Sequence, residues 1–310
     1  MPLVSVIVNV RNGATFLRDA LDCVMAQTFA DWEMIVWDDC STDESADIVA
    51  RYKDPRVRYF LSQDETVLGE ARDRAIRQAT GEWLAFLDQD DLWIPTKLEK
   101  QMAIADKQVG LIYGRSVLFW SNGRKRDYDQ AHEFTPLPEG SIFTELFRSA
   151  CFIAMSSVVL RRSAVEEAGG IPAWVELAPD YYLYLAVAHR YEARAVQEVV
   201  CWYRMHDSNM WQDSRRKVYQ ESLKMIDQWA ACLEPGIAAF RRSTNATGLA
   251  LEEMRDGSAG AGIRRIFRDG SVAWLISRPF VYVVRRMRRG VQRPLWQEGH
   301  PQTPPSRHLL

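Results

Sequence analysis

Three carboxylates stand within four residues directly after an apolar run in the first third of the chain. They are Asp88, Asp90 and Asp91, and the run before them is Trp83–Leu87. Carboxylates this close repel one another unless a cation or hydrogen-bond donors lie among them. Oxygen ligands of this kind suit Mg²⁺ or Mn²⁺ held together with the phosphates of a substrate. The same spacing also suits an acidic turn that caps the following helix, so spacing alone leaves both interpretations open.

A second acidic pair, Asp38 and Asp39, follows the apolar run Trp32–Trp37. A carboxylate in this position can accept hydrogen bonds from a base N–H or a ribose hydroxyl, as acidic residues do beside dinucleotide sites. Ser41 and Glu44 have the spacing of a capping box and predict the start of a helix. The capping and nucleotide-binding roles are compatible, because the two aspartates lie outside the cap.

Strand and helix signals alternate along residues 1–113 and place these acids at one edge of a sheet. The predicted strands are Val4–Val8, Trp32–Trp37, Val57–Leu61, Trp83–Leu87 and Val109–Tyr113, and the predicted helices include Ala14–Gln27 and Glu70–Ala79. Such alternation predicts βαβ units in a mostly parallel sheet, whose ligands bind beyond the carboxyl ends of the strands. Asn9 follows the first strand and should lie at the same edge as the acids.

The pattern is less regular beyond Tyr113. Residues 122–140 are polar and contain Pro and Gly, which predicts a surface loop. The expected elements after this loop are strands at Ile153–Leu160 and Val196–Tyr203, a helix at Asp180–His189 and helices within residues 215–256.

The composition excludes several classes of protein. Apolar residues make up 47% of the 310 residues, enough for a substantial core. The net charge of -2 argues against a protein that binds polyanions, and we expect no nucleic acid partner. The five cysteines form no CxxC pair, so neither a zinc ribbon nor a disulfide framework is indicated. We find no signal peptide and no apolar stretch long enough to span a bilayer, and therefore expect a cytoplasmic protein.

The last fifty residues are strongly basic. Residues 262–294 contain nine arginines and one aspartate, and the arginines flank apolar and aromatic patches. This pattern predicts helices that lie in the interface of an anionic membrane leaflet. A solvated basic helix that packs against the acidic body is the alternative. No recognised nucleic acid-binding module accompanies the segment.

Three segments taken together resemble the nucleotide-binding half of family 2 inverting glycosyltransferases with the GT-A fold. They read VSVIVNVRNGATFLRDALDCVMAQTF, WEMIVWDDCSTDES and LGEARDRAIRQATGEWLAFLDQDDLW. The resemblance covers residues 3–98 closely and extends more loosely to Tyr203–Asn209. It is specific for the fold and for nucleotide-sugar binding, and says little about which sugar is used.

The resemblance implies an α/β fold with a GT-A (Rossmann-like), mostly parallel sheet flanked by helices. Residues 1–113 would form the nucleotide-sugar-binding half of one domain, and residues 114–214 its acceptor-binding half. Residues 215–296 would form a helical C-terminal extension, and residues 297–310 a disordered tail.

The resemblance also implies a set of nucleotide-binding residues. Asn9 and Arg11 would lie near the nucleotide after the first strand, and Arg11 stands where the family usually has an aromatic residue. Asp39 would contact the base, typically uracil. Arg72 matches the arginine of the family's A-R-N segment and would approach the nucleotide, with Asp73 in place of the usual asparagine.

A divalent metal, Mn²⁺ or Mg²⁺, is implied by the family's DxD-type motif. By the family pattern Asp90 would contact ribose and share the metal site with Asp91, and the assignment among Asp88, Asp90 and Asp91 is open by one position. His206 could ligate the metal or contact the diphosphate, or be a hydrogen-bonded structural histidine. Arg204 could pair with a phosphate or with a carboxylate.

The catalytic base of the family lies at the start of a helix, in a pattern like E-D-x-D-L-x-L. The matching stretch here is Pro179–Leu185, and Asp180 stands at the position of the base. It would take the proton of an acceptor hydroxyl, and the helix N-terminus would stabilise its anion. Asp180 could instead be only an N-cap. Pro179 and Tyr182 replace two acidic residues of the pattern, which leaves acceptor recognition and activity open.

An aromatic group near this helix has two interpretations. Its members, Trp174, Tyr181, Tyr182 and Tyr184, could stack on a sugar ring or a prenyl-linked acceptor. Ordinary core packing is the prediction we favour for at least half of them.

The expected function is a metal-dependent hexosyl transfer from a nucleoside-diphosphate sugar, with UDP as the favoured carrier. The acceptor would be a glycan or a lipid-linked saccharide of bacterial surface polysaccharide synthesis, at the inner face of the cell membrane. A processive Q-x-x-R-W motif is absent, so we expect one sugar to be transferred at each encounter.

Three other functions are alternatives to this expectation. A nucleotidyltransferase normally has a glycine-rich loop after its first strand, whereas Gly13 is the only glycine in that turn. A non-catalytic nucleotide-sugar-binding or assembly scaffold stays open because of Pro179 and Tyr182. A membrane-binding interaction protein could depend on residues 262–294 alone.

Overall fold

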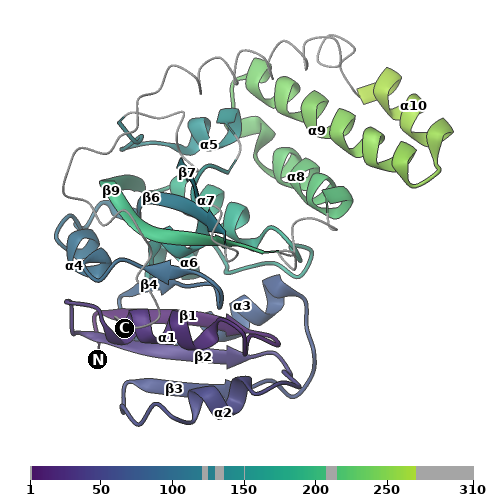
Figure 1. Cartoon of the computed structure of the whole chain (residues 1–310). Helices are drawn as coiled ribbons and strands as arrows, with labels where there is room; N and C mark the ends of the chain where they lie inside the picture. Colours follow the sequence, from purple (N-terminus) through teal and green to yellow (C-terminus); the bar gives the residue numbers. More distant parts are fainter. Residues whose placement is uncertain (1, 121–124, 130–135, 150, 207–214, 270–310) are drawn as a thin grey trace. The chain divides into compact units, whose positions relative to one another are not determined.

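The computed structural model describes residues 2–120, 125–129, 136–149, 151–206 and 215–269. The chain divides into two compact units, residues 1–209 and residues 210–309 (Figure 1). Most of the predicted membrane-binding segment and the whole predicted tail lie outside the described residues.

The first half of the sheet in the first unit is parallel, with the order β3-β2-β1-β4. These strands are β1 (Val4–Val10), β2 (Trp32–Asp38), β3 (Val57–Leu61) and β4 (Trp83–Phe86). Strands β2 and β4 are buried along their whole length, and β1 along nearly all of it. Central parallel strands are covered on both faces, which explains why these three read as continuous apolar runs.

The second half of the sheet mixes parallel and antiparallel pairs. Its strands are β5 (Leu92–Trp93), β6 (Val109–Trp120), β7 (Lys125–Asp129), β8 (Val159–Arg161) and β9 (Glu192–Met205). Strand β8 lies antiparallel between β4 and β6, and β9 runs parallel to β6 and antiparallel to β5. The long β9 therefore ends close to the residues that follow β4.

Helices surround this sheet (Figure 1). They are α1 (Leu17–Met25), α2 (Ser45–Val49), α3 (Leu68–Ile76), α4 (Lys97–Met102), α5 (Phe143–Ser149), α6 (Arg162–Glu167) and α7 (Pro179–Ala188). Helix α1 buries Leu17, Ala20, Leu21 and Val24, a spacing that places one apolar stripe against the core. The predicted α/β fold with a mostly parallel sheet is confirmed.

Several local predictions were wrong. The expected loop at 122–140 contains β7, which pairs with β6. The expected strand Ile153–Leu160 begins as a short 3₁₀ helix, Met155–Ser157, and becomes a strand only at Val159. The capping box also fails, because the Ser41 hydroxyl accepts the Asn12 N–H at 2.9 Å and no side chain caps α2.

The second unit is helical, as predicted. Its helices are α8 (Arg215–Trp229), α9 (Pro235–Arg255) and α10 (Ala259–Asp269). Helices α8 and α9 approach closely at Gly248, where an added Cβ would lie 2.5 Å from the Tyr219 ring. Glu253 is buried and pairs with Arg265 at 2.8 Å, which joins α9 to α10. Among the described residues, no helix has the length and apolar character needed to cross a membrane.

Candidate active site

The carboxyl ends of β1, β2 and β4 meet at one edge of the sheet. Register pairs Asn9 with Trp37, and Val10 with Asp38. The Asp39 N–H donates to the Val10 carbonyl at 2.8 Å, which keeps the loop after β2 beside the end of β1. The structure thus brings the polar residues that follow these strands to one edge.

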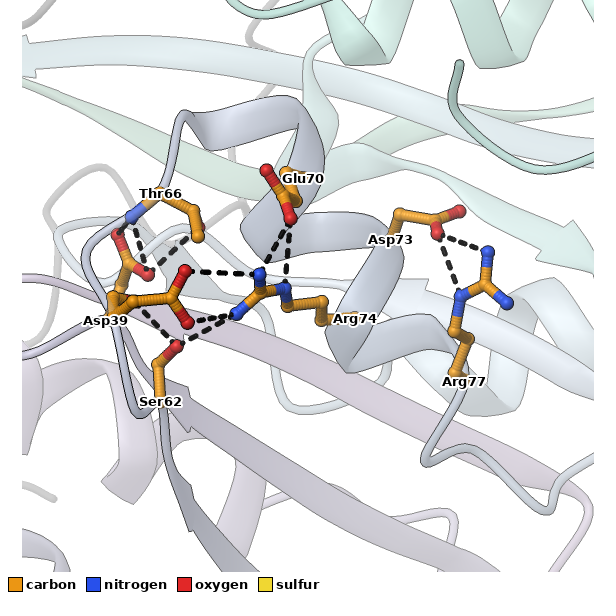
Figure 2. A network of polar contacts seen from close by, with 8 residues as sticks. Asp39, Ser62, Thr66, Glu70, Asp73, Arg74 and Arg77 are labelled. Atoms are coloured by element: carbon orange, nitrogen blue, oxygen red, sulfur yellow. Dashed lines mark hydrogen bonds and ion pairs between the residues drawn. The ribbon is translucent and has the colours of Figure 1, made fainter. Parts of the chain in front are cut away.

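Two aspartates after β2 have different surroundings. Asp38 is buried and accepts hydrogen bonds from the Ser41 N–H and the Tyr59 hydroxyl, both at 2.7 Å. It therefore stabilises the turn itself. The Asp39 carboxylate accepts from Thr66, from its N–H at 3.1 Å and from its hydroxyl at 2.9 Å (Figure 2). Asp39 is 4% exposed and meets the loop between β3 and α3.

Asn9 and Arg11 lie at the end of β1. The Asn9 Nδ2 is buried, and no hydrogen-bond partner for it exists among the described parts of the chain. Arg11 forms an exposed ion pair with Glu65 at 2.5 Å. Asn9 therefore has a donor to offer a ligand, whereas the Arg11 guanidinium lies at the surface.

Gln89 holds the loop after β1, a role that the sequence analysis missed. Its side-chain amide accepts the Arg11 N–H at 2.9 Å and donates to the Arg11 carbonyl at 3.2 Å. A Cβ at Gly13 would lie 2.5 Å from the Gln89 Oε1. Gly13 was the sequence signal for this contact, because only a residue without a Cβ leaves this space for the Gln89 side chain.

A buried arginine of α3 binds one of the acids that follow β4. Arg72 is 4% exposed and donates to Asp88 Oδ1 at 2.8 Å. Burial raises the pKa of Asp88 to about 6, against the opposing charge of Arg72, and Asp90 and Asp180 raise it further. Arg72 thus offsets part of the repulsion among these carboxylates.

Asp91 does not face the open edge. It is 1% exposed, and its two oxygens accept from the Ser156 hydroxyl at 2.5 Å and from the Arg204 N–H at 2.8 Å. Both carboxylate oxygens are engaged by the protein, so this residue anchors β9 beside the end of β4. This geometry favours Asp90 over Asp91 as a metal ligand.

Asp90 meets His206 just after the end of β9. The Asp90 Oδ2 and His206 Nε2 atoms are 2.8 Å apart, with side chains 20% and 13% exposed. The His206 ring also packs against Phe16, with ring centroids 5.0 Å apart. The predicted metal-site residues from the two halves of the unit are therefore adjacent.

Arg204 holds the backbone of Asp90 in place. Its Nε donates to the Asp90 carbonyl at 2.6 Å, and its Nη2 pairs with Asp19 at 3.2 Å. The guanidinium also lies over the rings of Phe16 and Phe119, at 4.5 and 4.8 Å from their centroids. The carboxylate partner expected for Arg204 is therefore Asp19.

The Asp90–His206 pair fits a divalent cation as two of its ligands. Neighbouring ligands of an octahedral cation lie about 3 Å apart, close to the separation of these two atoms. Within the described residues, no group of three or more His, Cys, Asp or Glu side chains is arranged to hold a metal. The remaining ligands would come from the diphosphate of a substrate and from water, as is usual for Mg²⁺.

Asp180 lies in the first turn of α7, directly after Pro179. Burial raises the pKa of Asp180, and the charge of Arg72 opposes that shift. Its Oδ1 accepts the Tyr181 N–H at 2.7 Å, and Ala178 occupies the N-cap position without a side-chain cap. Asp180 is therefore not the N-cap residue, although its carboxylate accepts an N–H of the first turn, and it lies within the field of the arginine that binds Asp88.

The aromatic residues of α7 belong to the core. Tyr181, Tyr182 and Tyr184 are at most 7% exposed. The Tyr181 hydroxyl donates to the Leu146 carbonyl at 3.1 Å, and Trp174 packs edge-to-face on Tyr182. The favoured core interpretation is confirmed for the three tyrosines.

Comparison with known proteins gives related sequences. Three relatives are TuaG of Bacillus subtilis, whose name assigns it to teichuronic acid biosynthesis, the uncharacterized glycosyltransferase alr2836 of Nostoc and WfgD of Escherichia coli. TuaG is 41% identical over 33% of this chain and 41% of its own length. For alr2836 the identity is 30% over 66% of each protein, and for WfgD it is 29% over 60% of this chain and 69% of WfgD. The chain thus spans between two fifths and about two thirds of these relatives.

Solved structures show the same fold at low sequence identity. Staphylococcus aureus TarS 1-349 in complex with UDP-GlcNAc has a TM-score of 0.62 at 18% identity, over 86% of this chain and 73% of that one. The mannosyltransferase PcManGT of Pyrobaculum calidifontis, solved with GDP-Man and Mn²⁺, has a TM-score of 0.61 at 21% identity, over 93% and 82%. Both are glycosyltransferases of the GT-A type. The family model for glycosyl transferase family 2 matches residues 5–169, more than half of the 310 residues, and the chain belongs to that family.

Proposed function

We propose that this protein is an inverting glycosyltransferase that uses a nucleoside-diphosphate sugar, with UDP as the favoured carrier. The acceptor would be a hydroxyl group of a glycan or of a lipid-linked saccharide. One observation carries the proposal. The buried Arg72 binds Asp88 at the donor edge of the sheet, and its charge also acts on Asp180 at the start of α7. The positive charge of Arg72 therefore acts on both the proposed base and the proposed donor site.

Asp180 would act as the general base. It would accept the proton of the acceptor hydroxyl while the oxygen forms a bond to C1 of the donor sugar. The bond between C1 and the diphosphate oxygen breaks on the opposite face, which inverts the anomeric centre. Burial raises the pKa of Asp180, which makes its carboxylate a stronger base, and Arg72 keeps the carboxylate available in its ionised form.

The nucleotide would bind between the ends of β1 and β2. Asp39 offers carboxylate oxygens that can accept from a base N–H, and these oxygens now accept from Thr66. Asn9 offers a buried Nδ2 donor that the described protein leaves unused. WfgD and WfaP, relatives at 29% and 28% identity, are both named as UDP-Glc transferases, which supports UDP as the carrier.

Asp90 and His206 would hold a divalent cation, Mn²⁺ or Mg²⁺, together with the donor diphosphate. When bound, the cation would neutralise charge that develops on the leaving diphosphate. Arg204 would keep Asp90 in place through its carbonyl, and Asp91 would keep the end of β9 in place through the Arg204 N–H.

A lipid-linked acceptor is supported by two relatives from Escherichia coli. WfgD and WfaP are both named as UDP-Glc:alpha-D-GlcNAc-diphosphoundecaprenol beta-1,3-glucosyltransferases. We therefore place the reaction at the inner face of a bacterial membrane, in surface polysaccharide synthesis. Residues 262–294 would contact the anionic membrane, and of these the structure describes 262–269 within α10, where Ile263 is 49% exposed.

A thermal unfolding titration of the full chain tests the donor site. UDP, GDP, CDP and dTDP are each added with Mn²⁺ or with EDTA. A nucleotide at one hundred times its Kd stabilises the folded state by about 2.7 kcal/mol. We expect UDP to raise the Tm, and the Mn²⁺-dependent part of that shift to be lost in Asp90→Asn and in His206→Asn.

The matched control is His189→Asn, because His189 is an exposed histidine at the end of α7, outside the cluster. It should keep the full Mn²⁺-dependent shift. Equal shifts in all three variants, or a shift that EDTA does not reduce, would contradict the proposed metal site. UDP binding without release of UDP from UDP-Glc or UDP-GlcNAc would favour the non-catalytic scaffold.

A further inference from the structure

Three consecutive residues of α3 contact three separate parts of the unit. Arg72 binds Asp88 after β4. Arg74 binds the loop between β3 and α3, at Ser62 and at Asp64. Asp73 leaves the helix in a different direction from Arg74 (Figure 2). The functional site described above does not use Asp73, which also departs from the family's usual asparagine.

Asp73 binds the turn that precedes α7. Its Oδ1 accepts the Ile171 N–H at 3.0 Å. The preceding Gly169 and Gly170 both have positive φ, +86° and +70°, and a Cβ at Gly170 would lie 2.6 Å from the Asp73 Oδ1. Glycine is the residue that adopts this backbone without strain and leaves room for the carboxylate. The turn is therefore shaped around the Asp73 side chain.

A second contact lies one helical turn earlier on α3. The Gly69 N–H donates to the Glu176 carbonyl at 3.0 Å, and a Cβ at Gly69 would lie 1.8 Å from the Val175 carbonyl oxygen. Residues four apart share one face of a helix, so Gly69 and Asp73 present the same face of α3. That face holds the segment 170–176, which ends four residues before Asp180.

We infer that Asp73 is a positioning residue for the general base, an inference that rests on the proposed function of Asp180. Asp73 fixes the segment 170–176 on α3, and the adjacent Arg72 binds Asp88. One rigid helix thus sets the separation between the residue that takes the proton and the residues that hold the donor. A misplacement of about 1 Å can lower a reaction rate about a hundredfold, so such an anchor has a measurable effect.

The anchoring contact needs an oxygen acceptor and no charge. The second Asp73 oxygen pairs with Arg77 at 2.8 Å, and the Arg77 side chain is 72% exposed. The pair is open to solvent on the Arg77 side, whereas the Asp73 side chain is 14% exposed, and screening by solvent weakens the attraction. Asp73→Asn keeps an oxygen for the Ile171 N–H, whereas Asp73→Ala removes it. Arg77→Gln removes the ion pair alone and is the matched control.

The first measurement is the steady-state hydrolysis of UDP-Glc and of UDP-GlcNAc by the full chain with Mn²⁺, in which water replaces the acceptor hydroxyl and UDP is released. We expect Asp73→Ala to lower kcat tenfold to a hundredfold while the KM for the donor stays within twofold. Asp73→Asn and Arg77→Gln should stay within threefold of the wild type in both parameters. Gly170→Ala disturbs the same contact from the other side and should reproduce the fall in kcat. A fall in all four variants, or an unchanged kcat in Asp73→Ala, would overturn the inference.

The second measurement is amide hydrogen exchange, which needs no turnover. Asp73→Ala should exchange faster than the wild type in residues 170–178, with exchange in β1 and β2 unchanged. Unchanged exchange in residues 170–178 overturns the inference whatever the activity. A third outcome is that Asp73→Ala exchanges faster in residues 170–178 while the wild-type protein releases no UDP. That result contradicts the proposed function. Asp73 would then be a structural anchor only, which also overturns the inference.

Discussion

The buried lysine of α4 gives a prediction whose size follows from the structure. Lys97 has no exposed surface. Its Nζ donates to the neutral Gln101 Oε1 at 2.8 Å and lies 4.0 Å from the centroid of the Trp93 ring. Burial lowers the pKa of Lys97 from 10.5 to about 7, and the nearby thiols of Cys201 and Cys23 only partly oppose the shift. The folded protein therefore holds this proton less tightly than the unfolded chain does.

The fall from 10.5 to about 7 sets the magnitude. Each pKa unit corresponds to 1.36 kcal/mol, so burial of the charged form of Lys97 costs about 5 kcal/mol below pH 7. Between pH 7 and pH 10.5 the unfolded state binds more protons than the folded state, and stability therefore rises with pH. From pH 6 to pH 9 the contribution of Lys97 to the free energy of unfolding should rise by about 2.5 kcal/mol.

Chemical denaturation of the wild type and of Lys97→Met at pH 6, 7.5 and 9 tests this reasoning. Methionine has a similar volume and no charge, so the variant should gain relative stability at pH 6 and lose about half of that gain by pH 9. Lys100→Met is the control, because Lys100 lies on the same helix and pairs with Glu198 at the surface. Its difference from the wild type should not change with pH. A pH-independent difference for Lys97→Met would refute the argument.

Two further predictions concern the site itself. Asp180→Asn keeps the shape of the side chain and removes the base, so UDP release should fall at least about a hundredfold while the UDP-induced rise in Tm is kept. Loss of that rise would instead make Asp180 a residue of the nucleotide site. Ser156→Ala removes the hydroxyl that donates to the buried Asp91 and accepts from the Asp88 N–H. It should lower the free energy of unfolding by about 1 to 3 kcal/mol in denaturant titrations, and an unchanged value would show that Asp91 is satisfied in another way.

The edge that carries the site could be predicted from the sequence. Parallel strands buried on both faces read as apolar runs, and the polar residues that follow them must meet at one edge. Asn9, Asp39 and Asp88 do so in the structure. The adjacency of Asp90 and His206 was suggested only by the family resemblance, because 116 residues separate them.

The different environments of Asp90 and Asp91 could not be predicted. The two residues are chemically identical neighbours, and local pattern gives no reason to prefer one as a ligand. The difference comes from Ser156 and Arg204, which lie 65 and 113 residues further along the chain and engage the Asp91 oxygens. The pattern at Ser156 predicted a strand, whereas the chain makes a short 3₁₀ helix that turns this hydroxyl toward Asp91.

Three glycines mark close contacts between segments that are far apart in the sequence. Gly13, Gly69 and Gly170 each leave space that another group fills, and those groups are the Gln89 amide, the Val175 carbonyl and the Asp73 carboxylate. Each contact joins the nucleotide half either to the metal motif or to the segment that carries the proposed base. The proposed chemistry would therefore depend on these glycines as well as on the acids, because each glycine leaves room for a contact that holds an acid-bearing segment in place. A substitution at one of these glycines should displace the acids without changing any of them.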